Sequence, residues 1–217
     1  MKINDLNSLQ EHIDKEIAWR KKELSWQSEL VVTSKEKNRE YVIRAAMLIL
    51  YSHWEGTIKR VGEYYLCYVG CQNLKYKDLK HNFLGILLFK KHKNLSNSKK
   101  AKDYNSCILE LIKEEKRYKN LYEVIPVKSN LNSEAFKNIL ELIGVSIEDE
   151  EIQLDDNLID VVLLGTRNKI AHGERFENLN IDEERFLDIS RKVLKIIETF
   201  CETIMNYAIN QKYLKRI

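Results

Sequence analysis

The chain has 217 residues, enough for one large or two small domains, and its 44% hydrophobic residues suffice for a buried core. One proline and seven glycines leave few of the turns that all-β folds need, while 32% charged residues suit amphipathic helices, so an all-β fold is nearly excluded. The 36 basic and 33 acidic residues give a net charge of +3, which neither demands nor forbids a polyanionic partner.

We expect no secretory signal and no membrane-spanning segment in this chain. The first five residues are polar and lack the apolar core of a secretory signal, and the longest apolar stretch, 45–51, is about a third of the length that crosses a bilayer. The four cysteines are too few for a disulfide scaffold, and no histidine stands at zinc-finger spacing from the Cys67/Cys71 pair. We therefore expect a soluble, cytoplasmic protein with reduced thiols, without a membrane segment, metal or cofactor.

Two long amphipathic helices are expected at the start of the chain. Apolar residues recur at helical spacing from Leu6 to about Leu30, with Trp19 and Trp26 near the same stripe. The next segment, 35–69, contains no proline and traces one helical face that small and polar residues interrupt: Tyr41, Ala45, Leu48, Ser52, Glu55, Lys59, Gly62 and Leu66. Long antiparallel helices bury their stripes against each other, so these two favour an all-α helical bundle.

The middle of the chain is less regular. Short helices are expected at 83–91 and 104–118. Between them, the segment from Lys90 to Lys102 is polar and strongly basic and has no apolar periodicity. We interpret it as an exposed loop inserted at about 90–103.

The rest of the chain predicts three more helices. A short one is expected at 133–142, and a mostly apolar one from 158 to 172, where Gly173 would stop it. A long helix at 182–213 carries a clean apolar stripe. No internal repeat, glycine-rich phosphate loop or strand pair is visible, so we expect one α-helical domain over 1–217.

Arg167, Asn168 and His172 place three polar groups at the end of the otherwise apolar helix. At about 100° per residue, Asn168 and His172 share a face, whereas Arg167 and His172 diverge by about 140°. Arg167 could reach around on its flexible stem, the last turn could unwind at Gly173, or a second subunit could supply the facing group. We favour the second subunit, because a two-fold axis doubles each motif.

These residue types suit chemistry on a phosphodiester. A histidine near its neutral-pH transition can transfer protons, and an arginine fork can hold a phosphate through two contacts. No carboxylate cluster has the spacing of a dedicated metal site, so metal-assisted nuclease chemistry is the weaker alternative. An Arg/His pair that only caps the helix end is the competing structural interpretation.

The segment 167–172 resembles the Arg-polar-x3-His motif of the HEPN superfamily, and it precedes a final long helix as in that family. The stretch 51–56, which reads Tyr-Ser-His-Trp-Glu-Gly, resembles the Tyr-x-His-Trp-Glu-Gly signature of the MAE-type bacterial branch. The stretch 129–134 resembles that branch's Ser-Asn-Leu-Asn sequence. The combination is much more specific than the six-residue motif alone.

The resemblance implies a HEPN-like helical bundle that dimerises, so that two Arg-x4-His motifs face one cleft and act as a metal-independent endoribonuclease. By that analogy His172 transfers protons, Arg167 stabilises the phosphate, and Asn168 orients one of these two side chains. The 2′-hydroxyl of RNA would be the nucleophile, which leaves a 2′,3′-cyclic phosphate and spares DNA. Such families often serve in toxin–antitoxin systems or anti-phage defence, beside a neutralising or activating partner protein.

The sequence departs from some HEPN toxins at one position. Those toxins are silenced by modification of a tyrosine two residues after the motif histidine, where this chain has Glu174. We therefore do not expect this form of control. Inactive HEPN proteins also exist, so the alternatives are a non-catalytic module that binds RNA, a nucleotide or a protein, and an antitoxin or structural subunit in which Arg167 and His172 are dispensable.

Other residues could support such a site. Glu55 lies on the polar break of the second helix and is expected to orient Arg167 or His172 by a hydrogen bond, whereas His53 is expected to be a helix-packing or hydrogen-bonded histidine. The three tryptophans are expected in core or dimer packing. Because a charged loop is usually only solvated, RNA contact is the less favoured role of the basic segment, whose lysines could otherwise grip a phosphate backbone: Lys90, Lys91, Lys93, Lys99, Lys100 and Lys102.

Overall fold

The computed structural model describes residues 2–95, 100–113, 115–118, 125, 130–146, 152, 154–175 and 181–215, apart from the side chains of 92–95. Every regular element within this part of the chain is a helix, which confirms the all-α prediction. None of these helices combines the length and the apolar character that a membrane span requires.

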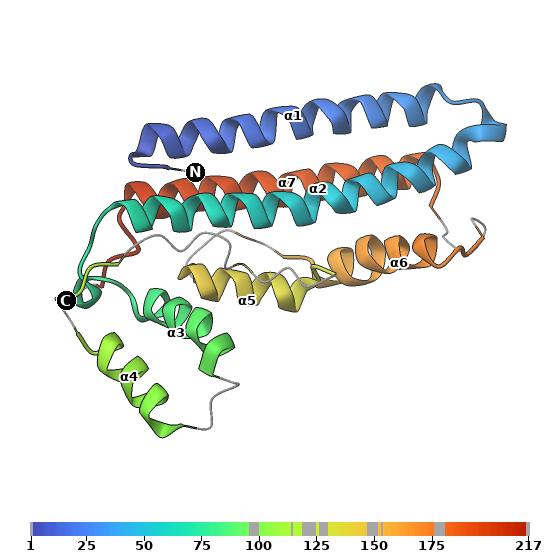
Figure 1. The fold of residues 1–217 in the computed structure, drawn as a ribbon. Helices are drawn as coiled ribbons and strands as arrows, with labels where there is room; N and C mark the ends of the chain where they lie inside the picture. The colour runs from blue at the N-terminus through green and yellow to red at the C-terminus, as the bar shows by residue number, and fades with distance from the viewer. Residues whose placement is uncertain are drawn as a thin grey trace.

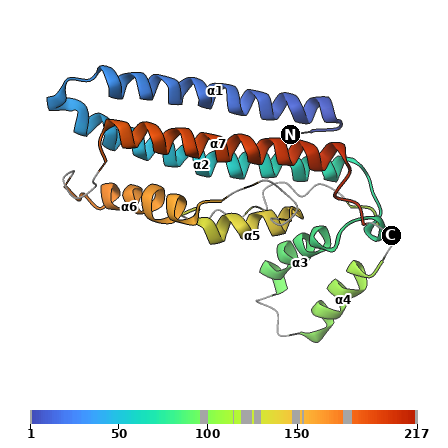
Figure 2. The same cartoon turned by 180° about the vertical axis from the view of Figure 1, so that it is seen from behind.

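Three long helices form the body of the molecule: α1 (Leu6–Thr33), α2 (Glu36–Cys71) and α7 (Glu183–Ile209). α1 and α2 run antiparallel, and α7 packs along both of them (Figure 1). The 36 residues of α2 span about 54 Å. α5 (Ser133–Ile143) and α6 (Gly165–Ala171) lie on the side of α2 away from α1, as the view from behind also shows (Figure 2).

α1 begins at a capping box, in which the Asp5 carboxylate accepts a hydrogen bond from the Ser8 N–H at 2.8 Å. Two polar residues belong to its buried stripe, which consists of Leu9, Ile13, Arg20, Leu24, Gln27 and Val31. Trp19 and Trp26 lie outside this stripe and are 47% and 58% exposed. Of the three tryptophans, only Trp54 packs in the core of the single chain.

α2 is buried on more than one side, because it contacts α1 and α7 as well as α5 and α6. The Trp54 ring lies 5.1 Å from the ring of Phe136 on α5, which in turn lies 5.7 Å from Phe200 on α7. The sequence predicted that α2 buries a single face. In the structure that face is largely exposed to solvent in the first half of the helix, where Tyr41 is 76% exposed and Ser52 is exposed as well. A helix enclosed in this way does not bury one stripe, and the sequence-based assignment of the buried face was wrong.

α3 (His81–Leu95) and α4 (Ala101–Leu111) form a helical hairpin that contacts α5 through α3 (Figure 1). The prediction of an exposed loop at about 90–103 is therefore wrong for 90–95 and 101–103, which are helical, while 96–99 lie outside the described residues. Lysine is a good helix former, so the basic segment continues α3, and Lys91 pairs with Glu110 across the hairpin.

Other helix ends follow from local hydrogen bonds. α4 ends earlier than expected, because the chain turns and the Tyr118 N–H donates to the Leu74 carbonyl at 2.8 Å. α5 is capped by Asn132, whose side-chain oxygen accepts a hydrogen bond from the N–H of the third helical residue at 2.8 Å. Gly144 ends α5 in the left-handed conformation, with φ 76°.

Candidate functional site

α6 continues without a break from a π-helix, η2 (Leu158–Leu164). The Gly165 N–H donates to the carbonyl of Asp160, five residues earlier, so the helix is locally wider just before the Arg-x4-His motif. π-Helical turns occur frequently at functional sites. The side chains of Asp160 and Arg167, on this one helical segment, both reach the chain at 130–133.

The Arg167 guanidinium is held by three side chains. Its Nη1 donates to Asn168 Oδ1 at 2.8 Å and to Asn130 Oδ1 at 3.1 Å, and its Cζ lies 5.2 Å from the centre of the Tyr51 ring, within cation–π range. Within the described ranges, no hydrogen bond uses its Nε or Nη2. The fork is therefore fixed in position and keeps donors for an anion.

Asn130 reaches Arg167 because the backbone beside it is clamped to α2. The Leu131 N–H donates to the Tyr51 hydroxyl at 2.6 Å, and the Trp54 indole N–H donates to the Leu131 carbonyl at 3.1 Å. Asn130 has φ 71°, a left-handed conformation that asparagine adopts more readily than most residues. This turn directs the Asn130 side chain toward Arg167.

A second clamp joins the start of α5 to η2. The Asp160 carboxylate accepts hydrogen bonds from the Ser133 N–H and the Ser133 hydroxyl, both at 2.6 Å. Because Asp160 and Arg167 lie on one continuous helical segment, this clamp holds 130–133 in register with Arg167. Sequence reasoning missed Asp160, whose signal was a single charge inside an apolar run.

Glu55 interacts with Tyr51 rather than with the motif residues. Burial raises the pKa of Tyr51, and the hydrogen bond and charge of Glu55 raise this pKa further, so the phenol stays protonated at neutral pH. Glu55 makes no hydrogen bond to Arg167 or His172 in the part of the chain that the structure describes. It reaches Arg167 only through the Tyr51 side chain.

Arg167 lies at a cavity of about 450 Å³ between α2 and α6. The cavity brings a cationic fork, a neutral phenol and a carboxylate to one surface. Its lining consists of Leu48, Tyr51, Ser52, Glu55, Gly56, Arg167 and Ala171. The volume and the charge of Arg167 suit a small anionic group such as a phosphate.

His172 ends α6 and lies apart from this cavity. The residue is exposed, and its imidazole has no partner among the residues that the structure describes. Gly173, with φ 79°, turns the chain directly after it, and Arg44 of α2 donates to the Glu174 carbonyl at 2.5 Å. One chain therefore brings Arg167 and Asn168 together and leaves His172 outside.

Most of the lysines proposed as RNA contacts lie on the α3–α4 hairpin. The Lys93 side chain and Lys99 lie outside the described residues. Lys91 pairs with Glu110, while the other three described side chains are exposed: Lys90, Lys100 and Lys102. None of the described lysines lines the Arg167 cavity.

A buried charged cluster that sequence reasoning did not anticipate lies between α1 and α2. Arg20, 6% exposed, donates from Nη2 to Glu16 at 2.5 Å, and its Nη1 lies 3.1 Å from His53 Nδ1. Glu23 Oε2 lies 2.9 Å from the other ring nitrogen of His53. Burial, followed by the charge of Arg20, lowers the pKa of His53, so this imidazole is neutral at neutral pH.

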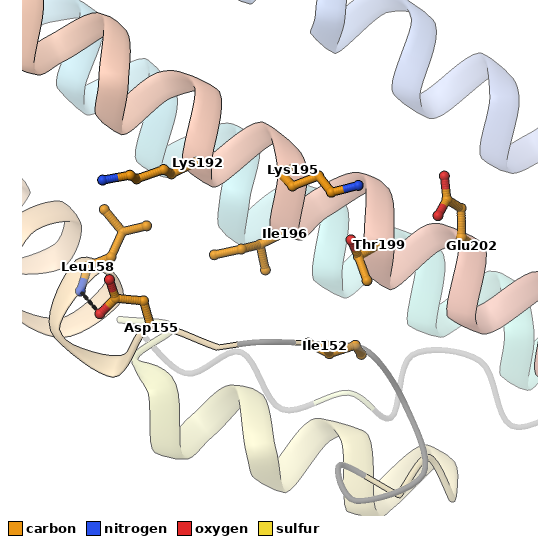
Figure 3. A pocket seen from close by; sticks show the side chains of 8 residues that line it. All are labelled: Ile152, Asp155, Leu158, Lys192, Lys195, Ile196, Thr199 and Glu202. Atoms are coloured by element: carbon orange, nitrogen blue, oxygen red, sulfur yellow. Dashed lines mark hydrogen bonds between the residues drawn. The ribbon is translucent and has the colours of Figure 1, made fainter.

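A further hollow, of about 600 Å³, lies along α7 opposite Ile152, Asp155 and Leu158 (Figure 3). Lys192 and Lys195 reach over it from α7, and none of the site residues expected from the sequence lines it. Over the described ranges, no three His, Cys, Asp or Glu side chains gather closely enough to hold a metal ion.

Comparison with known protein families gives a match over nearly the whole chain. A family model described as HEPN_MAE_28990-like HEPN matches residues 9–213. No curated protein and no solved structure is significantly similar to the chain. The matched region extends from α1 to beyond α7 and includes both clamps around Arg167.

Proposed function

Because this chain belongs to the HEPN_MAE_28990-like HEPN family, we propose that it is a metal-independent endoribonuclease that uses Arg167, Asn168 and His172. Members of the HEPN superfamily are often nucleases or other RNA-related modules. The observation that carries the proposal is the Arg167 guanidinium, fixed by Asn130, Asn168 and Tyr51 beside an open cavity.

The proposed reaction uses the Arg167 guanidinium at this cavity and the imidazole of His172. With a phosphodiester on the free donors of Arg167, the neighbouring ribose 2′-oxygen forms a bond to phosphorus and the bond from phosphorus to the 5′-oxygen breaks. The 2′-hydroxyl proton passes to a neutral imidazole, and the departing 5′-oxygen takes a proton from an imidazolium. Arg167 stabilises the added negative charge, and the products are a 2′,3′-cyclic phosphate and a 5′-hydroxyl.

A second copy of the chain completes the site in this proposal. His172 lies outside the cavity that contains Arg167, and both are on the surface. A two-fold axis beside α6 places the His172 of each copy opposite the Arg167 of the other. The proposed setting is a toxin–antitoxin or anti-phage system, in which a partner protein restrains or activates the dimer.

Cleavage of total cellular RNA in excess chelator tests the proposal. We expect the wild type to cut RNA and leave cyclic phosphate ends, and Arg167→Ala and His172→Ala to lose about 100-fold or more of the rate. Arg191→Ala and His81→Ala are matched controls, because both residues are exposed and lie outside the cavity. Their rates should remain within about two-fold of the wild type.

Two results would contradict the ribonuclease proposal. One is cleavage that persists in folded Arg167→Ala and His172→Ala proteins. The other is RNA that binds the wild type, with or without a genetic partner, and stays intact. The second result would favour a non-catalytic HEPN module that binds RNA, a nucleotide or a protein.

A further inference from the structure

A second cavity adjoins the Arg167 cavity on α2. It has a volume of about 740 Å³ and lies between α1 and α2. The two cavities have Ser52 and Gly56 in common, so only one ridge of α2 separates them. The two cavities are therefore adjacent on the surface of α2.

The geometry of α2 gives the distance between the two cavities. The first cavity uses positions such as Leu48 and Tyr51, and the second uses Ile49, His53 and Arg60. At about 100° per residue, the α2 positions that line the first cavity (48, 51, 52, 55 and 56) and those that line the second (49, 52, 53, 56, 59, 60 and 63) have centres about 70° apart around the helix, which is roughly 7 Å along its surface. One nucleotide unit covers a distance of this order.

Trp19 forms part of the wall of the second cavity and is held in a defined position. The guanidinium carbon of Arg20 lies 4.4 Å from the centre of its ring, and the His53 ring meets it edge-on at 5.3 Å. The indole is nevertheless 47% exposed. A rigid, half-exposed aromatic ring loses little conformational entropy when a planar ligand stacks on it.

The charges around Trp19 divide into an inner and an outer set. The inner set is paired, since Arg20 bonds to Glu16 and His53, and Glu23 lies against His53. The outer set consists of Lys59, Arg60 and Glu63. Glu63 is half-buried, whereas Lys59 and Arg60 are exposed, and neither of these two cations forms an ion pair with any residue that the structure describes. These outer cations are the groups that remain available to a phosphate backbone.

We propose that this second cavity is a nucleobase subsite, in which a base next to the phosphate on Arg167 stacks on Trp19 while Lys59 and Arg60 contact the backbone. The identification of RNA as the ligand rests on the proposed function. Single-stranded RNA is the ligand favoured, because a stacked base requires an unpaired strand and every base offers a flat face to an indole.

The test measures RNA binding separately from cleavage. His172→Ala protein, which should not consume the probe, is titrated against a fluorescently labelled single-stranded RNA of about 12 nucleotides. Trp19→Ala should weaken the Kd by about 5- to 100-fold. Trp26→Ala is the matched control, since Trp26 lies on the same helix, is 58% exposed and lines neither cavity, and it should change the Kd less than about two-fold.

Two further probes report on stacking itself. RNA binding should quench the intrinsic fluorescence of the Trp26→Phe protein, and Trp19→Phe should lose most of that quenching. An abasic strand of the same length should bind with an affinity that does not depend on Trp19. Circular dichroism establishes whether each variant is folded. If Trp19→Ala does not fold, Trp19→Phe replaces it, because this variant keeps an aromatic ring at the position.

The outcomes separate this inference from the proposed function. If the wild type does not cut RNA but its binding depends on Trp19, the subsite stands and the nuclease proposal fails. If the wild type cuts RNA and Trp19→Ala leaves the Kd unchanged, the subsite is overturned. It is also overturned if sedimentation shows that Trp19→Ala weakens self-association and leaves RNA affinity at fixed dimer concentration unchanged.

Discussion

The Arg20 guanidinium fits between α1 and α2 because residue 56 carries no side chain. A Cβ on Gly56 would lie 2.8 Å from Arg20 Nη2 and 3.1 Å from Nη1, which is too close without a displacement. The guanidinium does not swing aside freely, because Glu16 and His53 hold it. One glycine on α2 thus allows a buried charge on α1 to keep both of its partners.

Replacement of this glycine should be costly. We expect Gly56→Ala to lower the free energy of unfolding by about 1–3 kcal/mol, as overpacking does in close-packed interiors. Gly85→Ala is the matched control, because Gly85 also lies within a helix and, apart from its chain neighbours and the backbone of its own helix, no heavy atom lies within 4 Å of its Cβ position. That change should raise the free energy by about 0.5–1 kcal/mol. Urea unfolding measures both, and effects of the same sign would contradict the assigned contact.

His53 should make stability depend on pH near neutrality. Its pKa is lowered in the folded chain by burial and by Arg20, so below pH about 6.5 the unfolded chain binds the proton more readily than the folded one. The contribution of His53 to the free energy of unfolding should therefore be fully present above that pH. It should be lost as the pH drops, which lowers the free energy of unfolding by at most about 1.4 kcal/mol at pH 5.5. Denaturant titrations between pH 7.5 and 5.5 should show a smaller fall for His53→Gln than for the wild type, and parallel curves would contradict this assignment.

The sequence predicted the motif residues more completely than their surroundings. Arg167 at a helix end and the stop at Gly173 follow from local spacing, which a sequence displays directly. Asn130 and Asp160 come from distant parts of the chain, and their contacts depend on packing that no local pattern encodes. Arg20 did have a signal, since it occupies a position in the buried stripe of α1 where an apolar residue is usual.

At the scale of elements, the clamp between η2 and α5 determines where the Arg167 cavity forms. We expect Asp160→Ala to lower the free energy of unfolding by about 2–3 kcal/mol, because two charge-assisted hydrogen bonds to Ser133 are lost. RNA cleavage should also decrease, because Asn130 is no longer held against Arg167.

Asp156→Ala is the control for this element, since Asp156 also pairs with α5, through Lys137, but the two side chains are 53% and 40% exposed. It should change the free energy of unfolding by less than about 1 kcal/mol. Chemical denaturation of the two variants measures the difference. Equal destabilisation would show that the carboxylate of Asp160 has no special role.

The long helices were predictable and the connections between them were not. Regular apolar spacing and a lack of proline predicted α1, α2 and α7 to within a few residues. The extension of α3 into the basic segment depends partly on the pair of Lys91 with Glu110, which only the folded hairpin brings together. The faces that α2 buries depend on how many neighbours surround it, and a single helix does not reveal that number.

At the scale of the whole molecule, the proposed site needs two copies of the chain. Mixing Arg167→Ala protein with His172→Ala protein should restore cleavage that neither has alone. Random exchange makes about half of the dimers mixed, and each mixed dimer has one complete site of two, so we expect about a quarter of wild-type activity. The mixture is assayed after exchange of subunits. Activity no higher than that of the separate variants would show that both groups act within one chain.

α7 packs against α1 and α2, yet more than 100 residues of the chain separate the end of α2 from the start of α7. At 5–20 residues per second, a ribosome needs about 6 to 20 seconds to synthesise that interval. During this time α1 and α2 have already been made, and the apolar side chains that α7 covers face water. The nascent protein therefore passes through a stage that is open to aggregation and to chaperone binding, and slower translation of the interval lengthens it.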